Sequence, residues 1–136
     1  MDACVFCRIA AGAGPAHLVA ADAHTLAFLD TAPATLGHTI VVPRRHIAAV
    51  WDLTDDDGAR LAGAVRVTAL RLRAALEPDG LTITHSTGAA AGQEVPHVHV
   101  HLVPRWYGDN VRAPWSGAPA DHADLAAIAE HIRGAG

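Results

Sequence analysis

Three histidines alternate with valines in residues 97–101, His-Val-His-Val-His, and this row is the strongest chemical signal in the chain. Successive side chains of a β-strand point to opposite faces, so a strand here would place the three imidazoles on one face and the apolar residues on the other. Imidazole titrates near neutral pH and can act as a nucleophile or a proton carrier. The row could also bind a metal ion or simply face solvent, but the pattern favours a functional role.

A run of small residues, Gly88–Gly92, precedes the histidine row and is followed by Gln93. Small residues let the backbone approach a ligand closely, and backbone N–H groups can hold a phosphate. The amide of Gln93 would add a further donor. Most Gly/Ala-rich runs are only loops, but the position of this one beside the histidines predicts a phosphate cradle.

Cys4 and Cys7 are separated by two residues, a spacing that supplies half of a tetrahedral zinc site. The alternative is a pair of ordinary thiols, because this spacing by itself is common. A zinc site would need two further ligands, and His46 and His97 are the candidates that we select.

Several stretches together resemble the histidine-triad family of nucleotide hydrolases and transferases. Residues Gly92–Arg105 are similar to the family signature, and Cys4–Ile9 is similar to the opening of its zinc-carrying bacterial members. Phe28–Asp30 and Gly37–His46 resemble the nucleoside-binding half. The resemblance covers about residues 3–107 in the right order, which is more specific than any single motif.

The resemblance implies catalytic roles for three histidines. His99 would attack the α-phosphorus of a nucleotide and form a covalent nucleotidyl-histidine, which water then cleaves. His101 would bond to the neighbouring ring or to the substrate and set the tautomer, and His38 would be a further active-site histidine. We expect no catalytic metal, because the sequence has no Walker-type motif.

The resemblance also implies a set of binding residues. Asp30 would hold the ribose hydroxyls, and Gln93 would contact the phosphate and its bridging oxygen. The expected substrate-binding residues are Asp30, Ser86, Gln93, Glu94, Phe28 and Leu29. The expected base pocket, inferred from neighbouring positions, consists of Phe6, Ile9, Leu26, Phe28 and Leu29.

Two positions depart from the family pattern. Glu94 stands where many relatives have a Ser or Thr hydroxyl that would protonate the leaving group, and a carboxylate there would repel a phosphate. Ser86 and Thr87 stand where an Asn or Gln commonly helps to bind the phosphate side. Both departures bear on substrate preference and rate.

In zinc-carrying relatives, the ligands are the two thiolates, the histidine after the Pro-basic turn and the first histidine of the triad. The resemblance therefore implies a structural Zn²⁺ held by Cys4, Cys7, His46 and His97. Such a site is closed, and it would fasten the N-terminal segment to the strand that carries the triad.

The flanking sequence predicts the elements that position these residues. Thr54, as an N-cap with Asp57 three residues later, predicts the start of a long helix. Apolar alternation predicts strands, and a polar break at Asp22-Ala23 predicts a hairpin. The expected strands are 17–22, 24–30, 38–43, 81–84 and 98–102, and the expected helices are 54–77 and 121–133. This order predicts an α+β protein in which an antiparallel sheet of about five strands carries one long helix and a shorter C-terminal helix.

Composition limits the remaining possibilities. The 136 residues predict one domain, 1–136, with a core at about 3–107 and a C-terminal arm and helix at 108–136. The net charge of −4 and the absence of any Lys or basic tract exclude bulk binding of nucleic acid. No apolar run is long enough to cross a membrane. Because Met1–Cys4 does not resemble a signal peptide, we expect a cytoplasmic protein.

We therefore expect a hydrolase that releases a nucleoside monophosphate from a phosphoramidate or a dinucleoside polyphosphate, with a purine nucleotide, preferably of adenosine, as substrate. The alternatives are a nucleotidyltransferase or phosphorylase of the same family, a non-catalytic nucleotide-binding protein in which Glu94 has disabled turnover, and a metal centre on the histidine row. Because family members usually pair, we also expect a homodimer. Its candidate contacts are the helix at 54–77 and the arm at 106–115.

Overall fold

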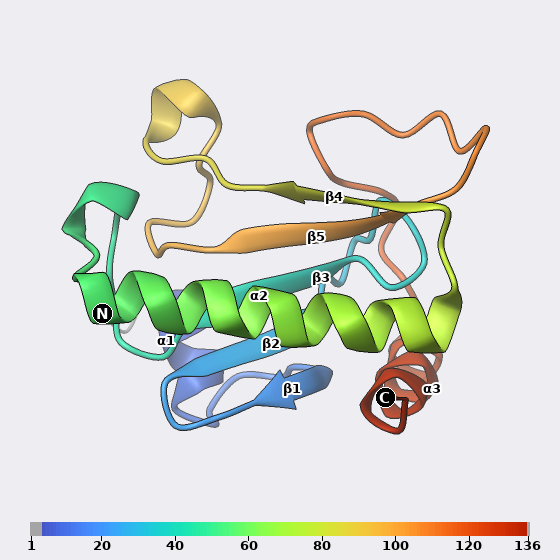
Figure 1. Ribbon diagram of the computed structural model, residues 1–136, viewed down its shortest axis with the longest axis horizontal. Helices are drawn as coiled ribbons and strands as arrows, with labels where there is room; N and C mark the ends of the chain where they lie inside the picture. Colours follow the sequence, from blue (N-terminus) through green and yellow to red (C-terminus); the bar gives the residue numbers. More distant parts are fainter. Residues whose placement is uncertain (1–3, 136) are drawn as a thin grey trace.

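A five-stranded antiparallel sheet forms the centre of the computed structural model, which describes residues 4–135 (Figure 1). The strands lie in the order β1-β2-β3-β5-β4. Their bounds are β1 Leu18–Ala21, β2 Thr25–Leu29, β3 Thr39–Pro43, β4 Gly80–Thr84 and β5 Val100–Arg105. The helices are α1 Val5–Ala10, α2 Asp55–Leu76 and α3 His122–Arg133, with short 3₁₀ turns η1 at Val50–Asp52 and η2 at Ala89–Ala91. The predicted α+β class with a long helix and a shorter C-terminal helix is confirmed.

Local signals in the sequence account for the hairpin and for the long helix. In the β1–β2 turn, the Asp22 carboxylate accepts the N–H groups of His24 at 2.8 Å and Thr25 at 2.7 Å. At the start of α2, Thr54 and Asp57 form the expected capping box, with bonds of 3.1 and 3.0 Å. Side-chain oxygens thus satisfy backbone donors that would otherwise lack partners at both points.

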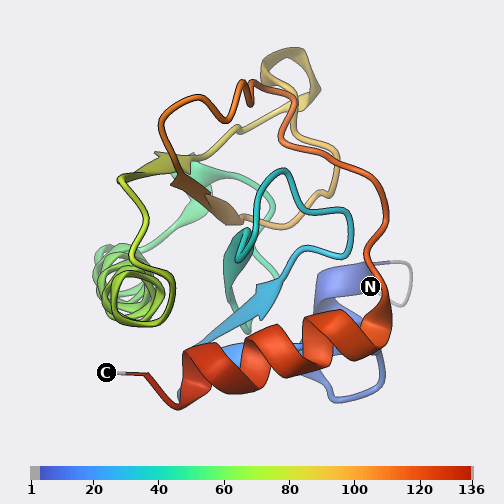
Figure 2. The same cartoon turned by 90° about the vertical axis from the view of Figure 1, so that its right-hand side faces the viewer.

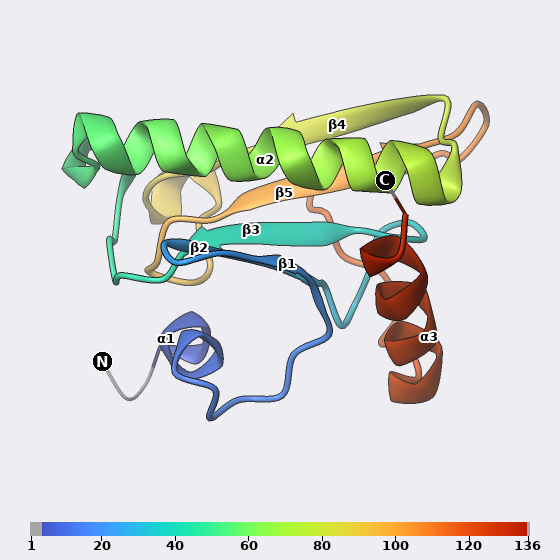
Figure 3. The same cartoon turned by 60° about the horizontal axis from the view of Figure 1, so that its bottom comes forward.

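The alternating strands give the sheet two apolar faces, each covered by helices. In one core cluster, Val41 and Leu102 of the sheet pack with Leu72 of α2 and Ile132 of α3. The other cluster lies under α1 and joins Phe6, Phe28, Ile40, Leu26 and Val42. Figures 2 and 3 show α2 and α1 on opposite sides of the sheet. The site described below lies on the α1 side.

The triad segment differs from the strand predicted at 98–102. Strand β5 begins only at Val100, so His97 and His99 precede it and His101 alone lies in it. The apolar residues that alternate with the histidines do share one face, because Val98, Val100 and Leu102 all belong to the core cluster that packs against α2. The segment before the strand reaches the start of α1, where Nδ1 of His97 lies 3.5 Å from Sγ of Cys4.

The stretch after β5, residues 106–120, includes the arm expected at 106–115 and runs back along the segment that follows β2. Gly117 donates its N–H to Ala32 O and Ala120 donates to Thr31 O, both at 2.9 Å. Two backbone bonds therefore hold this arm against the segment that follows β2. Within residues 4–135, no helix has both the length and the apolar character that a membrane crossing requires.

Candidate functional site

A cavity of about 760 Å³ opens on the α1 side of the sheet. It is lined by α1, the ends of β2, β3 and β4, the segment from Ala91 to Val95, the start of β5 and the arm. The residues expected to act on substrate that line it are Phe6, Ile9, Phe28, Leu29, Asp30, Ser86, Gln93, Glu94, His99 and His101. Leu26, which we expected in the base pocket, instead lies in the core cluster beneath α1. His38 is fully buried behind the cavity wall.

The buried ring of His99 has a defined tautomer. Its Nδ1 lies 2.8 Å from the main-chain oxygen of His97. A carbonyl can only accept, so Nδ1 carries the hydrogen and Nε2 keeps its lone pair. Burial lowers the pKa of His99, although the bond to the carbonyl opposes this shift. The His97 carbonyl therefore sets this tautomer, a task that the resemblance had assigned to His101.

A chain of hydrogen bonds sets the tautomer of His101 as well. The N–H of Ala34 donates to Nδ1 of His38 at 3.0 Å, so the Nε2 of His38 carries the hydrogen. That Nε2–H donates to Nδ1 of His101 at 2.9 Å. His101 is therefore left with an Nε2–H. Burial lowers the pKa of both His38 and His101 to about 4, so both rings are neutral at pH 7.

The hydrogen bonds of His99 and His101 leave complementary groups side by side. The rings of His99 and His101 have centroids 5.1 Å apart, and both line the cavity. One ring retains a lone pair, while the other retains an N–H. A nucleophile beside a hydrogen-bond donor is the pairing that attack on a phosphorus atom requires.

Asp30 lies where β2 ends, at the wall of the cavity. One of its oxygens accepts the N–H of Ala32 at 2.8 Å, and the other lies 3.7 Å from Nε2 of His38. Burial raises the pKa of this carboxyl, and the charge of Glu94 raises it further. Asp30, His38 and His101 are close enough to hold a metal ion, but both ring nitrogens of His38 already have hydrogen-bond partners.

Gln93 braces the small-residue loop from within. Its side-chain oxygen accepts the N–H of Gly88 at 2.7 Å, and its amide nitrogen donates to Ala48 O at 2.8 Å and Val95 O at 3.0 Å. Both amide hydrogens therefore go to the main chain. This arrangement differs from the expected contact with phosphate, although Gln93 does line the cavity.

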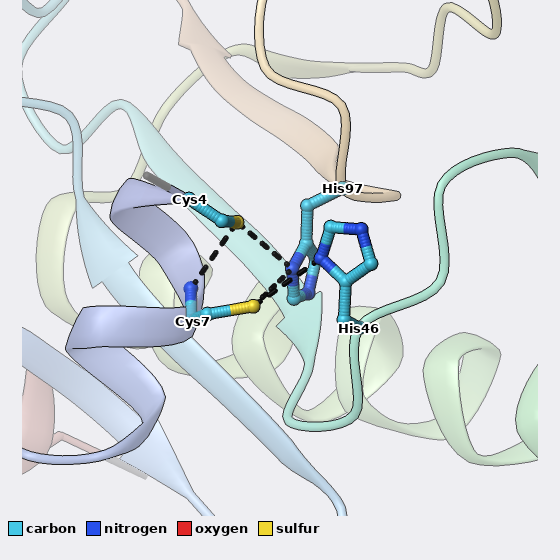
Figure 4. A group of neighbouring side chains, drawn as sticks. All are labelled: Cys4, Cys7, His46 and His97. Atoms are coloured by element: carbon cyan, nitrogen blue, oxygen red, sulfur yellow. Dashed lines mark hydrogen bonds between the residues drawn. The ribbon is translucent and has the colours of Figure 1, made fainter. Parts of the chain in front are cut away.

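The four expected zinc ligands converge beside α1 (Figure 4). The Sγ of Cys7 lies 3.2 Å from Nδ1 of His46, and Nδ1 of His97 lies 3.5 Å from Sγ of Cys4. Tetrahedral zinc with ordinary bond lengths separates sulfur from nitrogen by about 3.5 Å. The Nε2–H of His97 donates to Pro43 O at 2.8 Å, which leaves Nδ1 free to bind a metal. The geometry therefore fits a closed Cys₂His₂ zinc site.

Because His97 belongs to this cluster, the three histidines of the row do not converge on one another. Among residues 4–135, the groups able to hold a metal are the Cys/His cluster and the Asp30 group, and neither contains His99. The metal centre on the row that we considered from the sequence therefore lacks a common coordination point.

Two groups near His99 were not predicted from the sequence. His85, the residue after β4, donates its Nδ1–H to the main-chain oxygen of His99 at 2.9 Å. Trp115 of the arm lines the cavity, and the guanidinium of Arg105 lies 5.7 Å from its ring centroid. The number of histidines in the chain was the only signal for His85, and a Trp in a Gly/Pro-rich loop was the signal for Trp115.

Known proteins resemble the chain in both sequence and fold. Residues 11–107 match the family described as "HIT domain". The Bacillus subtilis protein "Protein hit" is 42% identical over 122 residues, which cover 89% of this chain and 81% of that protein. "Adenosine 5'-monophosphoramidase hnt1" of Schizosaccharomyces pombe is 33% identical over 132 residues, with 95% of each chain covered. The crystal structure of a "ZN-bound histidine triad family protein" from Mycobacterium smegmatis matches with a TM-score of 0.86 and 34% identity, and covers 98% of this chain and 92% of that one.

Proposed function

The chain belongs to the HIT family, and we propose that it hydrolyses nucleotides through a covalent intermediate on His99. The observation that carries this proposal is the pair of fixed tautomers. The His97 carbonyl leaves a lone pair on Nε2 of His99, and the His38 ring leaves an Nε2–H on His101.

In the first step, Nε2 of His99 attacks the α-phosphorus and forms a P–N bond while the bond to the leaving group breaks. A leaving amine takes up a proton from solvent, which has access to the exposed Glu94 side of the cavity. The Nε2–H of His101 offers a hydrogen bond to the charged phosphoryl oxygens. Water then attacks the phosphorus, the P–Nε2 bond breaks, and the proton of the water returns to solvent.

We assign the two ends of the cavity to the two ends of a nucleoside monophosphate. The apolar end, where the rings of Phe6 and Phe28 lie 5.5 Å apart, would hold a purine base, preferably adenine, next to Leu29. Asp30 would accept hydrogen bonds from the ribose hydroxyls. Ser86 and the loop that Gln93 braces would lie at the phosphate end.

The charges in the cavity favour an amine over a polyphosphate as the leaving group. Asp30 and Glu94 both line the cavity, whereas no Arg or Lys is found among its described lining residues. A polyphosphate chain would bring several negative charges close to these carboxylates, and like charges at short distance repel one another. A phosphoramidate has a single charge at phosphorus and is therefore the substrate class that we favour.

The Cys/His cluster would hold a structural Zn²⁺ that takes no part in the reaction. We further propose a homodimer in the cytoplasm. The outer edge of β4 has no partner within the described sheet, and Leu70 of α2 and Ile83 of β4 are 43% and 50% exposed. Thiols that serve as metal ligands also suit a reducing compartment.

The proposal can be tested by measuring the release of AMP from adenosine 5′-phosphoramidate with chromatography. We expect turnover by the wild-type protein and a loss of about 1,000-fold or more in His99→Ala. A protein that binds AMP but does not turn over the substrate would instead be the non-catalytic binding protein. Addition of inorganic phosphate distinguishes a transferase, because a transferase would then produce ADP in place of AMP.

A further inference from the structure

The proposed nucleophile lies just outside the hydrogen-bonded ladder of the sheet. The pairing of β5 with β3 ends at Val41↔Val100, and its pairing with β4 ends at Thr84↔His101. The main chain of His99 therefore precedes the last paired residue on both sides. A backbone without ladder bonds needs other contacts to hold a side chain at a fixed position.

The side chain of His85 supplies one such contact. His85 directly follows the last paired residue of β4, and its Nδ1–H donates to His99 O at 2.9 Å. On the preceding residue, the N–H of Val98 donates to Ile47 O at 2.6 Å. The nucleophile's segment is thus tied on one side by a backbone bond and on the other by the imidazole of His85.

The orientation of the His85 ring is itself fixed from a third segment. The N–H of Val50 in η1 donates to Oγ1 of Thr87 at 3.0 Å. The His99 carbonyl can only accept, so His85 carries its hydrogen on Nδ1. The Thr87 hydroxyl therefore donates to the free Nε2 of His85. The side chain is half-buried and does not line the cavity, so it has no direct access to a bound nucleotide.

We propose that His85 is a positioning residue that holds the main chain of His99 so that Nε2 points at the phosphorus. This inference rests on the proposed role of His99 as nucleophile. If the Nδ1–H bond to the His97 carbonyl were the only contact of His99, its ring could rotate together with the segment. The bond from His85 anchors the main-chain carbonyl of His99 as well. A misplacement of about 1 Å can cost about 100-fold in rate.

The test compares three variants in single-turnover experiments with adenosine 5′-phosphoramidate. His85→Ala removes the donor, whereas His85→Asn retains an N–H at the same distance along the side chain. His131→Ala is the matched control, because His131 also bonds a main-chain oxygen, Ala75 O at 2.9 Å, but far from the cavity. AMP affinity and zinc content are measured on every variant.

We expect His85→Ala to form the His99 adduct about 10- to 100-fold more slowly, with AMP affinity within about twofold of the wild type. His85→Asn should recover most of the rate, and His131→Ala should match the wild type. An unchanged rate in His85→Ala would overturn the inference. Equal losses in rate and in AMP affinity, with no recovery in His85→Asn, would also overturn it and indicate a structural role.

A second readout does not depend on turnover. In ¹⁵N-histidine spectra, we expect the Nδ1–H tautomer of His99 to dominate in the wild type and in His85→Asn, and to be mixed with the other tautomer in His85→Ala. Spectra that are the same in all three proteins would contradict the inference. Absence of a His99 adduct in the wild type would reject the proposed function, and this tautomer pattern would still show whether His85 orients the ring.

Discussion

The Cys/His cluster and the cavity use histidines from the same row, two residues apart, in opposite ways. His97 donates its Nε2–H to Pro43 O and presents Nδ1 to two thiols. His99 donates its Nδ1–H to His97 O and presents Nε2 to an open cavity. The carbonyl that each ring meets thus decides which nitrogen is free. One nitrogen faces a closed set of ligands and the other faces a space for substrate.

We expect the largest effect from a substitution that changes the cavity and leaves the Cys/His cluster intact. His99→Gln should lose about 1,000-fold or more in turnover while it keeps one zinc per chain, because His99 is not part of the cluster. Metal analysis of the purified variant, beside its rate of AMP release, checks this. Loss of zinc from His99→Gln would show that the two regions are not independent.

The reciprocal change is Cys7→Ser, which removes a ligand that contacts both His46 and His97. We expect loss of zinc and a decrease of about 3–4 kcal/mol in the free energy of unfolding at saturating metal. Denaturant unfolding with and without added zinc measures the decrease. Wild-type protein treated with a chelator serves as the control, and its free energy of unfolding should approach that of the variant. A free energy of unfolding that does not change with zinc would contradict a structural metal.

A smaller effect concerns pH. Burial lowers the pKa of His38 and His101 to about 4, below the value of 6.5 for an unfolded chain. Between these values the unfolded state binds more protons, so the free energy of unfolding falls as pH decreases from 6.5 to about 4. Each histidine adds about 1.4 kcal/mol per pH unit to this slope.

The variant His38→Asn tests this contribution to stability. Unfolding of both proteins at several pH values between 4.5 and 7.5, with metal removed from both, should give a slope that is lower in the variant by about one proton. Equal slopes would mean that the pKa of His38 is not lowered in the folded protein, contrary to the burial and the hydrogen bonds that keep this ring neutral.

The smallest expected effect concerns Glu94. Relative to the wild type, Glu94→Gln should shift the ratio of kcat/KM values for diadenosine triphosphate and adenosine phosphoramidate toward the polyphosphate by about three- to tenfold, because one repelling carboxylate is lost. The shift should weaken at high salt. Glu130→Gln, an exposed position on α3, is the control. An unchanged ratio would show that Glu94 does not influence the choice of leaving group.

The fold could largely be predicted from the sequence because its signals are local. The Thr54–Asp57 capping box and the alternation through Val98, Val100 and Leu102 depend on neighbouring residues alone. The long-range contacts carried no such signal. The start of β5 after His99 depends on where pairing with β3 and β4 ends, and no residue pattern marks that point.

Many of the residues that lie together around the cavity could be listed from the sequence, but their hydrogen-bond network could not. The spacing of Cys4 and Cys7, with the family resemblance, pointed to His46 and His97, and these four side chains do lie together. The internal bonds of Gln93 and the contact of His85 with the His99 carbonyl depend on side-chain directions that only the folded chain defines.

The covalent role of His99 can be tested by intact-protein mass spectrometry after a brief reaction with adenosine 5′-phosphoramidate and an acid quench. We expect an added mass of one adenylyl group on the wild-type protein and none on His99→Ala. Turnover of the substrate with the same rate in His99→Ala, or an adenylyl group that maps to another residue, would contradict the assignment of His99 as the nucleophile.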